Sequence, residues 1–294
     1  MTMTKLKPLV FFGSGPVGAA TLIGLTESGF EFEAIITKPR LAHHKGPMPV
    51  LDWTINHNIS VFTPADKAEL SDVFRTTSFM SGLGVVVDYG IIIAKSVIDS
   101  FELGIINSHF SLLPQWRGAD PITFAILSGQ KTTGVSLMLI DESLDTGNLL
   151  AQEKLTISKM DTAPDLTKRL ISLSNQLLGE AIPLYLAGDA RPYPQDTNIE
   201  PTYSRQLTKS DGQVNWGKPA EITEREIRAY LGWPKSLAKI FGKQVIITKA
   251  QVVEGESDGI LVIKCTPGWL EIQELIGPSG RTMSGADFIR GYKR

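Results

Sequence analysis

The sequence lacks several features that would place it outside the ordinary globular proteins. Its 294 residues include a single cysteine, Cys265, so an intrachain disulfide and a cysteine cage for zinc or an iron–sulfur cluster are excluded. Only four histidines are present and none has an H-x-x-x-H partner, so we expect no metal. Apolar runs such as residues 83–87 are far shorter than the ~20 residues that cross a bilayer. We therefore expect a cytoplasmic protein, or an organellar one if the source is eukaryotic.

The sequence also has no large excess of either charge, because it contains 29 basic and 31 acidic residues and its net charge is −2. This balance argues against a nucleic-acid coat protein. Its distribution is uneven: residues 204–294 hold 14 basic and 10 acidic side chains, and residues 1–203 hold 15 and 21. A mildly basic second part behind an acidic first part indicates two domains and permits a polyanionic partner.

Residues 1–188 alternate apolar, strand-like runs with helix-like segments. Fully apolar runs separated by helices predict a doubly wound, mostly parallel α/β sheet that is covered on both faces. The expected strands are 9–13, 32–37, 60–62, 83–87, 104–109 and 135–140, with a helix over 17–27 and a last helix over 164–186.

The pattern changes after this domain. Residues 189–206 contain three prolines and little apolar periodicity, so we interpret them as a linker. Residues 207–294 then predict a small, OB-like β-barrel, because short strands alternate with glycine-bearing turns. Its expected elements are a helix over 220–230, strands over 238–241, 244–253, 259–265 and 269–275, and a helix over 284–290.

A glycine-rich turn, Gly13-Ser14-Gly15-Pro16-Val17-Gly18, follows the first strand and opens a helix. G-x-G-x-x-G in this context is typical of dinucleotide binding, which also needs an acid at the end of the second strand. That strand ends with Thr37 and Lys38, and Lys38 or Arg40 could favour a 2′-phosphate instead. A nicotinamide oxidoreductase therefore stays open beside a simple tight turn, which could hold the phosphate of another ligand at the helix N-terminus.

Polar side chains follow the fifth expected strand. Asn107 and His109 are two residues apart and share one face, near the strand end where α/β ligands bind. Asp145 follows the next strand, which could bring it to the same rim. An amide, an imidazole and a carboxylate suit direct acyl transfer to an amine through a tetrahedral intermediate. A purely structural role for His109 is the alternative.

These residues resemble a known family. The strings Asn107-x-His109-x-Ser111-Leu112-Leu113-Pro114, Gly118-Ala119-x-Pro121-Ile122 and Leu144-Asp145-Thr146-Gly147 resemble the 10-formyltetrahydrofolate-dependent formyltransferases. Trp116-Arg117-Gly118-Ala119 and residues 134–138 are similar to the branch that acts on methionyl-tRNA. Residues 209–216 and Trp233-Pro234 resemble that family's C-terminal barrel. The resemblance implies transfer of the formyl group of 10-formyltetrahydrofolate to the amino group of initiator methionyl-tRNA, for translation initiation.

The resemblance also implies roles. Asn107 would polarise the formyl carbonyl, His109 would stabilise the oxyanion and move protons, and Asp145 would hold water and balance charge. The folate co-substrate would be bound by Val87, Tyr89, Ile91, Ile92, Ser111, Leu112, Leu113, Pro114, Ile140, Asp141 and Leu144. The tRNA would be bound by Lys38, Arg40, Lys45, Arg117, Arg205, Lys209, Lys235, Lys239 and Lys243. We expect a monomer without a membrane contact.

Two departures from the family stand out. The loop over 37–49 is short and carries His43 and His44 where stronger cations are usual, which predicts weaker or more pH-sensitive tRNA contact. Asp88 stands where a small residue is usual. Alternative functions are formyl transfer to an amino-sugar nucleotide, hydrolysis of the formyl-folate and a non-catalytic RNA-binding module.

Overall fold

The computed structural model describes residues 7–41 and 45–293. The chain divides into two compact units. The first contains the residues up to Arg117, Thr133–Leu155 and Arg169–Thr202. The second contains Gly118–Thr132, Thr156–Lys168 and the chain from Tyr203 onward. The domain boundaries at 188 and 206 that we expect from the sequence stay a prediction about which segments fold independently.

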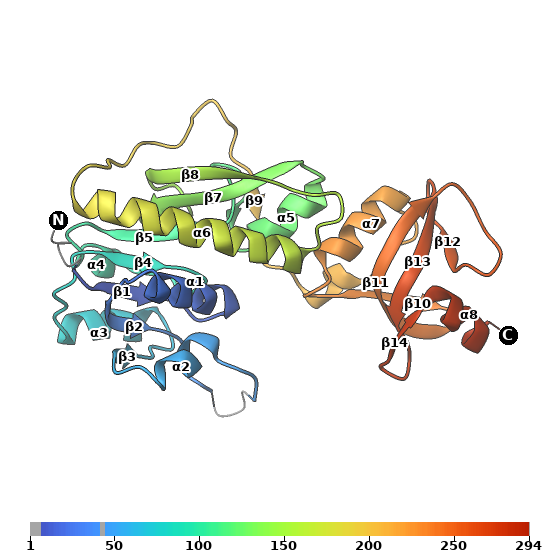
Figure 1. Cartoon of the computed structure of the whole chain (residues 1–294), viewed down its shortest axis with the longest axis horizontal. Coiled ribbons are helices and arrows are strands. Elements are labelled where there is room, and N and C mark those ends of the chain that lie inside the picture. The colour runs from blue at the N-terminus through green and yellow to red at the C-terminus, as the bar shows by residue number, and fades with distance from the viewer. Residues whose placement is uncertain (1–6, 42–44, 294) are drawn as a thin grey trace. The chain divides into compact units, whose positions relative to one another are not determined.

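The first unit is built on a seven-stranded sheet of order β3-β2-β1-β4-β5-β7-β8 (Figure 1). Strands β1 to β5 pair in parallel, whereas β7 runs antiparallel to β5. The doubly wound, mostly parallel sheet is therefore confirmed. Its strands are β1 Leu9–Phe12, β2 Phe32–Ile36, β3 Ser60–Phe62, β4 Gly84–Val86, β5 Ile105–His109, β7 Thr132–Leu139 and β8 Leu149–Thr156.

The sequence patterns do not predict strand β8, which lies at the edge of the sheet. It begins with two buried leucines and continues through the exposed Glu153 and Lys154. An edge strand needs no continuous apolar run, since only part of it is covered.

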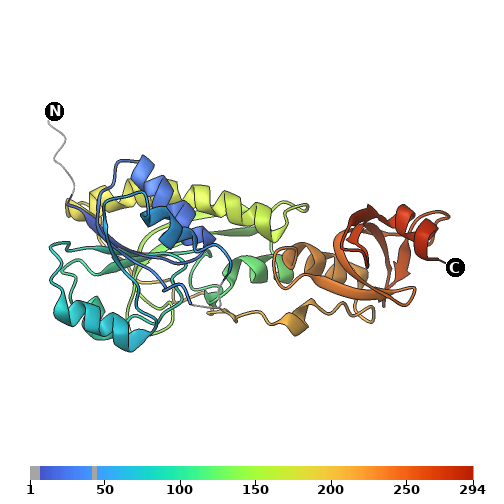
Figure 2. The ribbon, with the colours of Figure 1, turned by 90° about the horizontal axis from the view of Figure 1, so that it is seen from below.

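Helices cover both faces of this sheet. Helices α1 Pro16–Glu27 and α6 Ala163–Leu186 lie on one face, and α3 Lys67–Thr76 and α4 Lys95–Ile98 lie on the other (Figures 1 and 2). On the α3 side, Phe12 contacts Phe74, Tyr89 and Phe101 at centroid distances of 5.7–6.0 Å. On the α6 side, the hydroxyls of Ser108 and Ser174 meet at 2.7 Å in a buried contact. The remaining helices of the first 160 residues are α2 Pro49–Thr54 and α5 Pro121–Ser128.

The expected linker has some structure of its own. Tyr193 forms a bridge with Leu149 at the start of β8. Strand β9, Tyr203–Ser204, pairs with β6, Arg117–Gly118. A short 3-10 turn, Lys209–Gly212, follows.

The second unit contains a five-stranded antiparallel sheet that forms a half-barrel. Its core gathers apolar residues such as Ile227, Ile247 and Phe288, and it includes the buried Cys265. Strand β14 has no counterpart among the expected strands, because it is three residues long. The elements are α7 Ala220–Ala229, β10 Ser236–Ile240, β11 Lys243–Val253, β12 Val262–Lys264, β13 Trp269–Ile276, β14 Thr282–Ser284 and α8 Gly285–Tyr292.

No helix in the described part of the chain is both long and apolar enough to cross a bilayer.

The Ser108–Ser174 contact generates a prediction about stability. Replacing Ser174 by Ala leaves the buried hydroxyl of Ser108 without that partner, so we expect the free energy of unfolding of the first unit to fall by about 1–3 kcal/mol. Urea unfolding, followed by hydrogen exchange of β5, measures this. The double variant Ser108→Ala/Ser174→Ala should recover part of the lost stability. Ser71→Ala is the control and should change the free energy of unfolding little, because its hydroxyl makes only an exposed hydrogen bond within α3. A double variant as unstable as the sum of its single variants would contradict the paired role.

Candidate active site

The site is built on the face of β5 that points away from α6. Ser108 faces α6, so Asn107 and His109, one residue to either side, share the opposite face. Asn107 lies between Val86 of β4 and Met138 of β7, and its side chain is half-buried. His109 is buried. The pairing of these two side chains that the sequence predicts is therefore present.

His109 has different surroundings at its two ring nitrogens. Nε2 lies 2.9 Å from the carbonyl oxygen of Trp116, and a carbonyl can only accept, so Nε2 carries a proton. Nδ1 lies 3.7 Å from Oδ2 of Asp145, which is too long for a hydrogen bond but close enough for an ion pair when the ring is protonated. Nδ1 is therefore the atom at which this imidazole can take up or release a proton.

The strand that precedes Asp145 does not carry it directly to the strand end where His109 lies, as the sequence analysis expects. Because β7 runs antiparallel to β5, Leu139 at its end lies beside Ile106, away from the carboxyl end of β5. The loop between β7 and β8 therefore folds back along the sheet to bring the Asp145 carboxylate to His109. Asp145 adopts a left-handed backbone conformation, with φ of 53°.

Gln195, which the sequence analysis did not single out, holds this loop. Its Nε2 donates to the carbonyl oxygens of Asp145, at 2.8 Å, and of Gly147, at 3.0 Å. Its Oε1 accepts from the guanidinium of Arg117 at 2.7 Å. Gln195 lies in the expected linker, where no strand or helix pattern marks it. A glutamine between prolines is the one signal that the sequence offers.

Four of the eleven residues expected to bind folate lie in two apolar clusters that share Ile140. Tyr89, Ile91 and Ile140 belong to one apolar cluster, and Ile140 also packs against a second cluster that contains Leu113. Ile92 and Leu144 expose most of their side chains, at 75% and 61%. Leu112 is half-buried, Asp141 is exposed, and Val87 and Pro114 are buried.

The Ser111 hydroxyl is engaged within the chain, and its role in folate binding stays a prediction. Its side chain is fully buried and its hydroxyl donates to the carbonyl oxygen of Gln115, so it shapes the site through the backbone. Ser136, which sequence reasoning missed, donates to the Ser111 carbonyl at 2.6 Å and accepts from the Leu113 amide at 3.0 Å. Gln152 donates to the Leu113 carbonyl at 3.0 Å. These contacts fix the segment that follows His109.

The Tyr89 side chain indicates whether a flat polar ring can bind beside these residues. Its hydroxyl is buried and has no hydrogen-bond partner in the described part of the chain. Burial raises the pKa of this hydroxyl well above its usual range, so it stays protonated. A buried, protonated donor among apolar side chains fits a heteroaromatic ring that carries acceptors.

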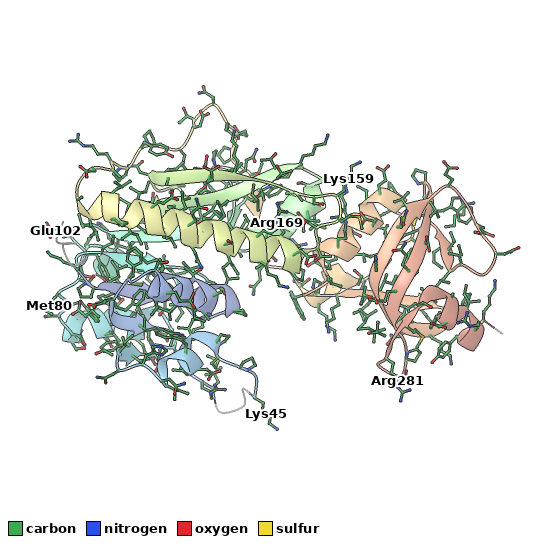
Figure 3. All side chains as sticks on the ribbon, in the orientation of Figure 1. Lys45, Met80, Glu102, Lys159, Arg169 and Arg281 are labelled. Carbon is green, nitrogen blue, oxygen red and sulfur yellow. The ribbon has the colours of Figure 1, made fainter. Side chains whose placement is uncertain are left out.

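The basic residues expected to bind tRNA differ in their exposure and in whether they already bind other residues of the chain. In the first unit, Arg40 donates to Asp52 at 2.6 Å and to the Gly46 carbonyl, and Arg117 donates to Gln195. Lys38 is half-buried, and Lys45 is exposed in the loop after β2 (Figure 3). His43 and His44 lie outside the described residues.

In the second unit, Arg205 forms a bidentate ion pair with Asp211, which holds the pKa of that carboxyl far below its usual range. The other four expected cations are exposed and have no ion pair within the described chain: Lys209, Lys235, Lys239 and Lys243.

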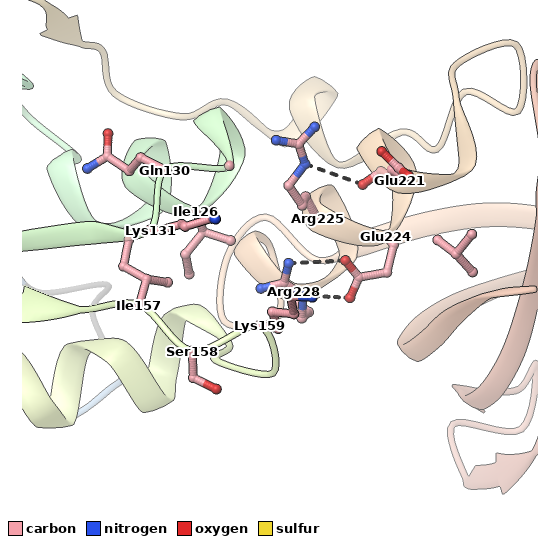
Figure 4. A pocket seen from close by; sticks show the side chains of 12 residues that line it. Ile126, Gln130, Lys131, Ile157, Ser158, Lys159, Glu221, Glu224, Arg225 and Arg228 are labelled. Atoms are coloured by element: carbon pink, nitrogen blue, oxygen red, sulfur yellow. Dashed lines mark hydrogen bonds and ion pairs between the residues drawn. The ribbon is translucent and has the colours of Figure 1, made fainter.

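A hollow of about 320 Å³ in the second unit adds cations that the sequence analysis did not name (Figure 4). Lys131 and Lys159 line it from one side, and Arg225 and Arg228 reach it from α7. Arg228 is bound by Glu224 and by the Asp161 carbonyl, so its charge is compensated. Lys131 and Lys159 have no such partner in the described structure.

Three or more acidic, histidine or cysteine side chains that could hold a metal ion do not come together anywhere in the described chain.

Comparison with known proteins decides the family. The formyl transferase model matches residues 11–182, and the model of the formyl transferase C-terminal domain matches residues 206–293. The chain belongs to the formyl transferase family. A methionyl-tRNA formyltransferase of Stutzerimonas stutzeri is 34% identical over 99% of this chain and 96% of its own length.

Two solved structures share the fold at low sequence identity. The N-formyltransferase of Helicobacter canadensis, in complex with folinic acid and dTDP-3-aminofucose, has a TM-score of 0.69 at 21% identity, over 91% of this chain and 98% of its own. HypX of Aquifex aeolicus, in complex with tetrahydrofolic acid, has a TM-score of 0.65 at 17% identity. This second likeness covers 98% of this chain and 47% of HypX.

The role of Gln195 generates the second prediction. Gln195→Met keeps the length of the side chain but removes the donors to Asp145 and Gly147, so the loop over 141–148 should open more often. We expect its amides to exchange hydrogen roughly five- to hundredfold faster, which corresponds to a loss of about 1–3 kcal/mol of local stability. Mass spectrometry of the peptides that cover this loop measures the rate. Gln176→Met on exposed α6 is the matched control, and unchanged protection in Gln195→Met would refute the holding role.

Proposed function

We propose that this protein is a methionyl-tRNA formyltransferase, which transfers the formyl group of 10-formyltetrahydrofolate to the amino group of initiator methionyl-tRNA. The approach of His109 Nδ1 to the Asp145 carboxylate, beside Asn107, carries the proposal. The full-length relatives at about one-third identity support the choice of acceptor. The solved relatives at 17–21% identity support the fold only.

The donor would lie against the apolar side chains around Ile140. Tyr89 and Ile91 belong to one apolar cluster with Ile140, and Leu113 belongs to a second cluster that Ile140 also contacts. The exposed side chains of Ile92 and Leu144 are available to cover a ring. The donor supplies a formyl group that is activated by its bond to nitrogen. Everything else in the reaction falls to this chain and to the acceptor amine.

Three groups of the chain would act on the reacting atoms. As the amine adds to the formyl carbon, negative charge develops on the formyl oxygen, and Asn107 Nδ2 can donate to it. His109 can donate to the same oxygen from Nδ1 when protonated, with the Asp145 carboxylate 3.7 Å from this nitrogen. The new carbon–nitrogen bond forms, the bond to the donor nitrogen breaks, and one proton passes from the amine to that nitrogen.

Electrostatics inside the site would give these groups their effect. His109 is 7% exposed and Asp145 is 12% exposed at their side chains, so water screens their interaction weakly. The donors are also held before substrate arrives, because Trp116 fixes the ring and Gln195 fixes the loop. Each preorganised donor of this kind lowers the activation barrier of acyl transfer by about 2.7–4 kcal/mol.

The mechanism is tested by His109→Gln. The amide nitrogen of Gln can reach the Trp116 carbonyl in place of Nε2, whereas nothing replaces Nδ1. We therefore expect the rate of formyl transfer to methionyl-tRNA to fall about 10²- to 10⁴-fold while the fold and the binding of tetrahydrofolate persist. The measurement is single-turnover transfer from 10-formyltetrahydrofolate.

The control for this experiment is His57→Ala, which removes an exposed histidine that stacks on Trp53. A His109→Gln variant with wild-type activity would leave His109 a structural role and refute the mechanism. Wild-type protein that binds the folate but formylates only an amino-sugar nucleotide would replace the acceptor and keep the chemistry.

The proposed tRNA contacts include all nine cations named from the sequence, and we expect them to contribute unequally. Exposed, unpaired lysines such as Lys209 and Lys239 can release counterions from phosphates, whereas Arg205 and Arg40 are already bound to aspartates.

Salt dependence separates these groups. Lys239→Gln should lower the slope of log Kd against log salt for tRNA by roughly 0.7–0.9 for each phosphate that the protein no longer neutralises. Arg205→Gln should change it less. Lys67→Gln on α3 serves as the control, because this exposed lysine lies on the other unit. Equal slopes in all variants would contradict the assignment.

A further inference from the structure

The glycine-rich turn between β1 and α1 is filled by a side chain of the same molecule. Helix α1 begins at Pro16 and has no side-chain cap and no acid in its first turn. The amides of Ser14 and Gly15 donate to the carbonyl oxygen of Asp88, at 3.0 and 3.3 Å. The carboxylate of Asp88 lies against Gly15, where a Cβ would come within 2.0 Å of its Oδ2. The backbone amides of Gly18 and Val17 act on this carboxylate by lowering its pKa.

Asp88 thus occupies the turn with both its carbonyl, which is bound by the first two amides, and its carboxylate, which lies next to the remaining two. Pro16 has no N–H, and the amide of Ala19 already donates to Gly15 within the helix. Residues 14–18 therefore present to Asp88 the arrangement of amides that binds phosphate in nucleotide-binding turns.

The glycines of the motif are explained by contacts within the chain. A Cβ on Gly15 would lie 2.0 Å from Oδ2 of Asp88, and one on Gly18 would lie 2.7 Å from the Val87 carbonyl oxygen. A side chain at residue 15 would therefore displace the Asp88 carboxylate, and one at residue 18 would collide with the backbone before Asp88. No ligand is needed to explain why glycine stands there.

A cation accompanies the carboxylate. The amide of Lys38 donates to the Ser14 hydroxyl at 3.3 Å, and its ammonium lies 2.7 Å from where a Cβ on Gly90 would stand. Lys38 and the two amides lower the pKa of Asp88, although burial outweighs them and raises it overall. Asp88 also adopts a φ of 52°, a left-handed conformation that aspartate tolerates better than most residues.

We propose that Asp88 is a built-in substitute for a bound phosphate, and that it closes the glycine-rich turn of this protein to nucleotide phosphates and dinucleotides. An incoming phosphate would meet amides that are already bonded and a carboxylate of like charge. Asp88 is thus a specificity-determining residue. This role of Asp88 does not depend on the proposed reaction.

The experiment uses inorganic pyrophosphate as the probe and the full chain as the protein. In the wild type, pyrophosphate should leave the amide signals of Val17 and Gly18 unchanged. Asp88→Gly opens the turn and accepts the left-handed backbone without strain. We expect it to bind pyrophosphate roughly five- to thirtyfold more tightly than the wild type, with shifts of those two amide signals.

Two further variants make the test decisive. Asp66→Gly removes a cap that accepts from the amides of Ala68 and Glu69 at 2.8 and 3.0 Å on α3, where no glycine-rich turn exists. It should bind pyrophosphate no more tightly than the wild type. Asp88→Asn, which keeps one acceptor and loses the charge, serves if Asp88→Gly does not fold, and it should raise the affinity in the same direction. Wild-type binding at Val17 and Gly18, or unchanged affinity in a folded Asp88 variant, would overturn the proposal.

Discussion

The hydrogen bond between His109 and the Trp116 carbonyl governs how the rest of the site can work. It engages one ring nitrogen and leaves Nδ1 as the single position for proton exchange, opposite Asp145. Trp116 adopts a φ of 56° and its amide donates to the Thr202 hydroxyl, so the carbonyl that orients the ring is itself held in place. A residue of the linker thereby helps to orient the imidazole from outside the sheet.

Three residues at or beside the predicted site residues have a strained backbone. Asp88, Trp116 and Asp145 all have positive φ, and each lies close to the predicted catalytic or folate-binding residues. Such conformations cost about 1–3 kcal/mol each and persist where surrounding contacts enforce them. Here the enforcing contacts are the amides of Ser14 and Gly15 for Asp88, Thr202 for Trp116 and Gln195 for Asp145.

Much of this arrangement could be predicted because it depends on short-range periodicity. Strands β1 and β4 contain no polar side chain, and a period of two places Asn107 and His109 of β5 on one face. The route of Asp145 could not be predicted, because the direction of β7 is decided by pairing and not by its own residues. Gln195 and Ser136 escape for a related reason: each acts through carbonyls and amides that are distant in sequence. Asp88 stands out in the sequence only as a departure from a family pattern, and its contacts with α1 require the fold.

The edges of the seven-stranded sheet have a consequence for assembly. At one edge, β3 is only three residues long, and at the other, β8 exposes Glu153 and Lys154 while Tyr193 bridges its first residue. Short, charged or covered edges offer little unpaired backbone for another strand to extend. The large sheet is thereby protected from edge-to-edge aggregation, even though its central strands are among the most apolar segments of the chain.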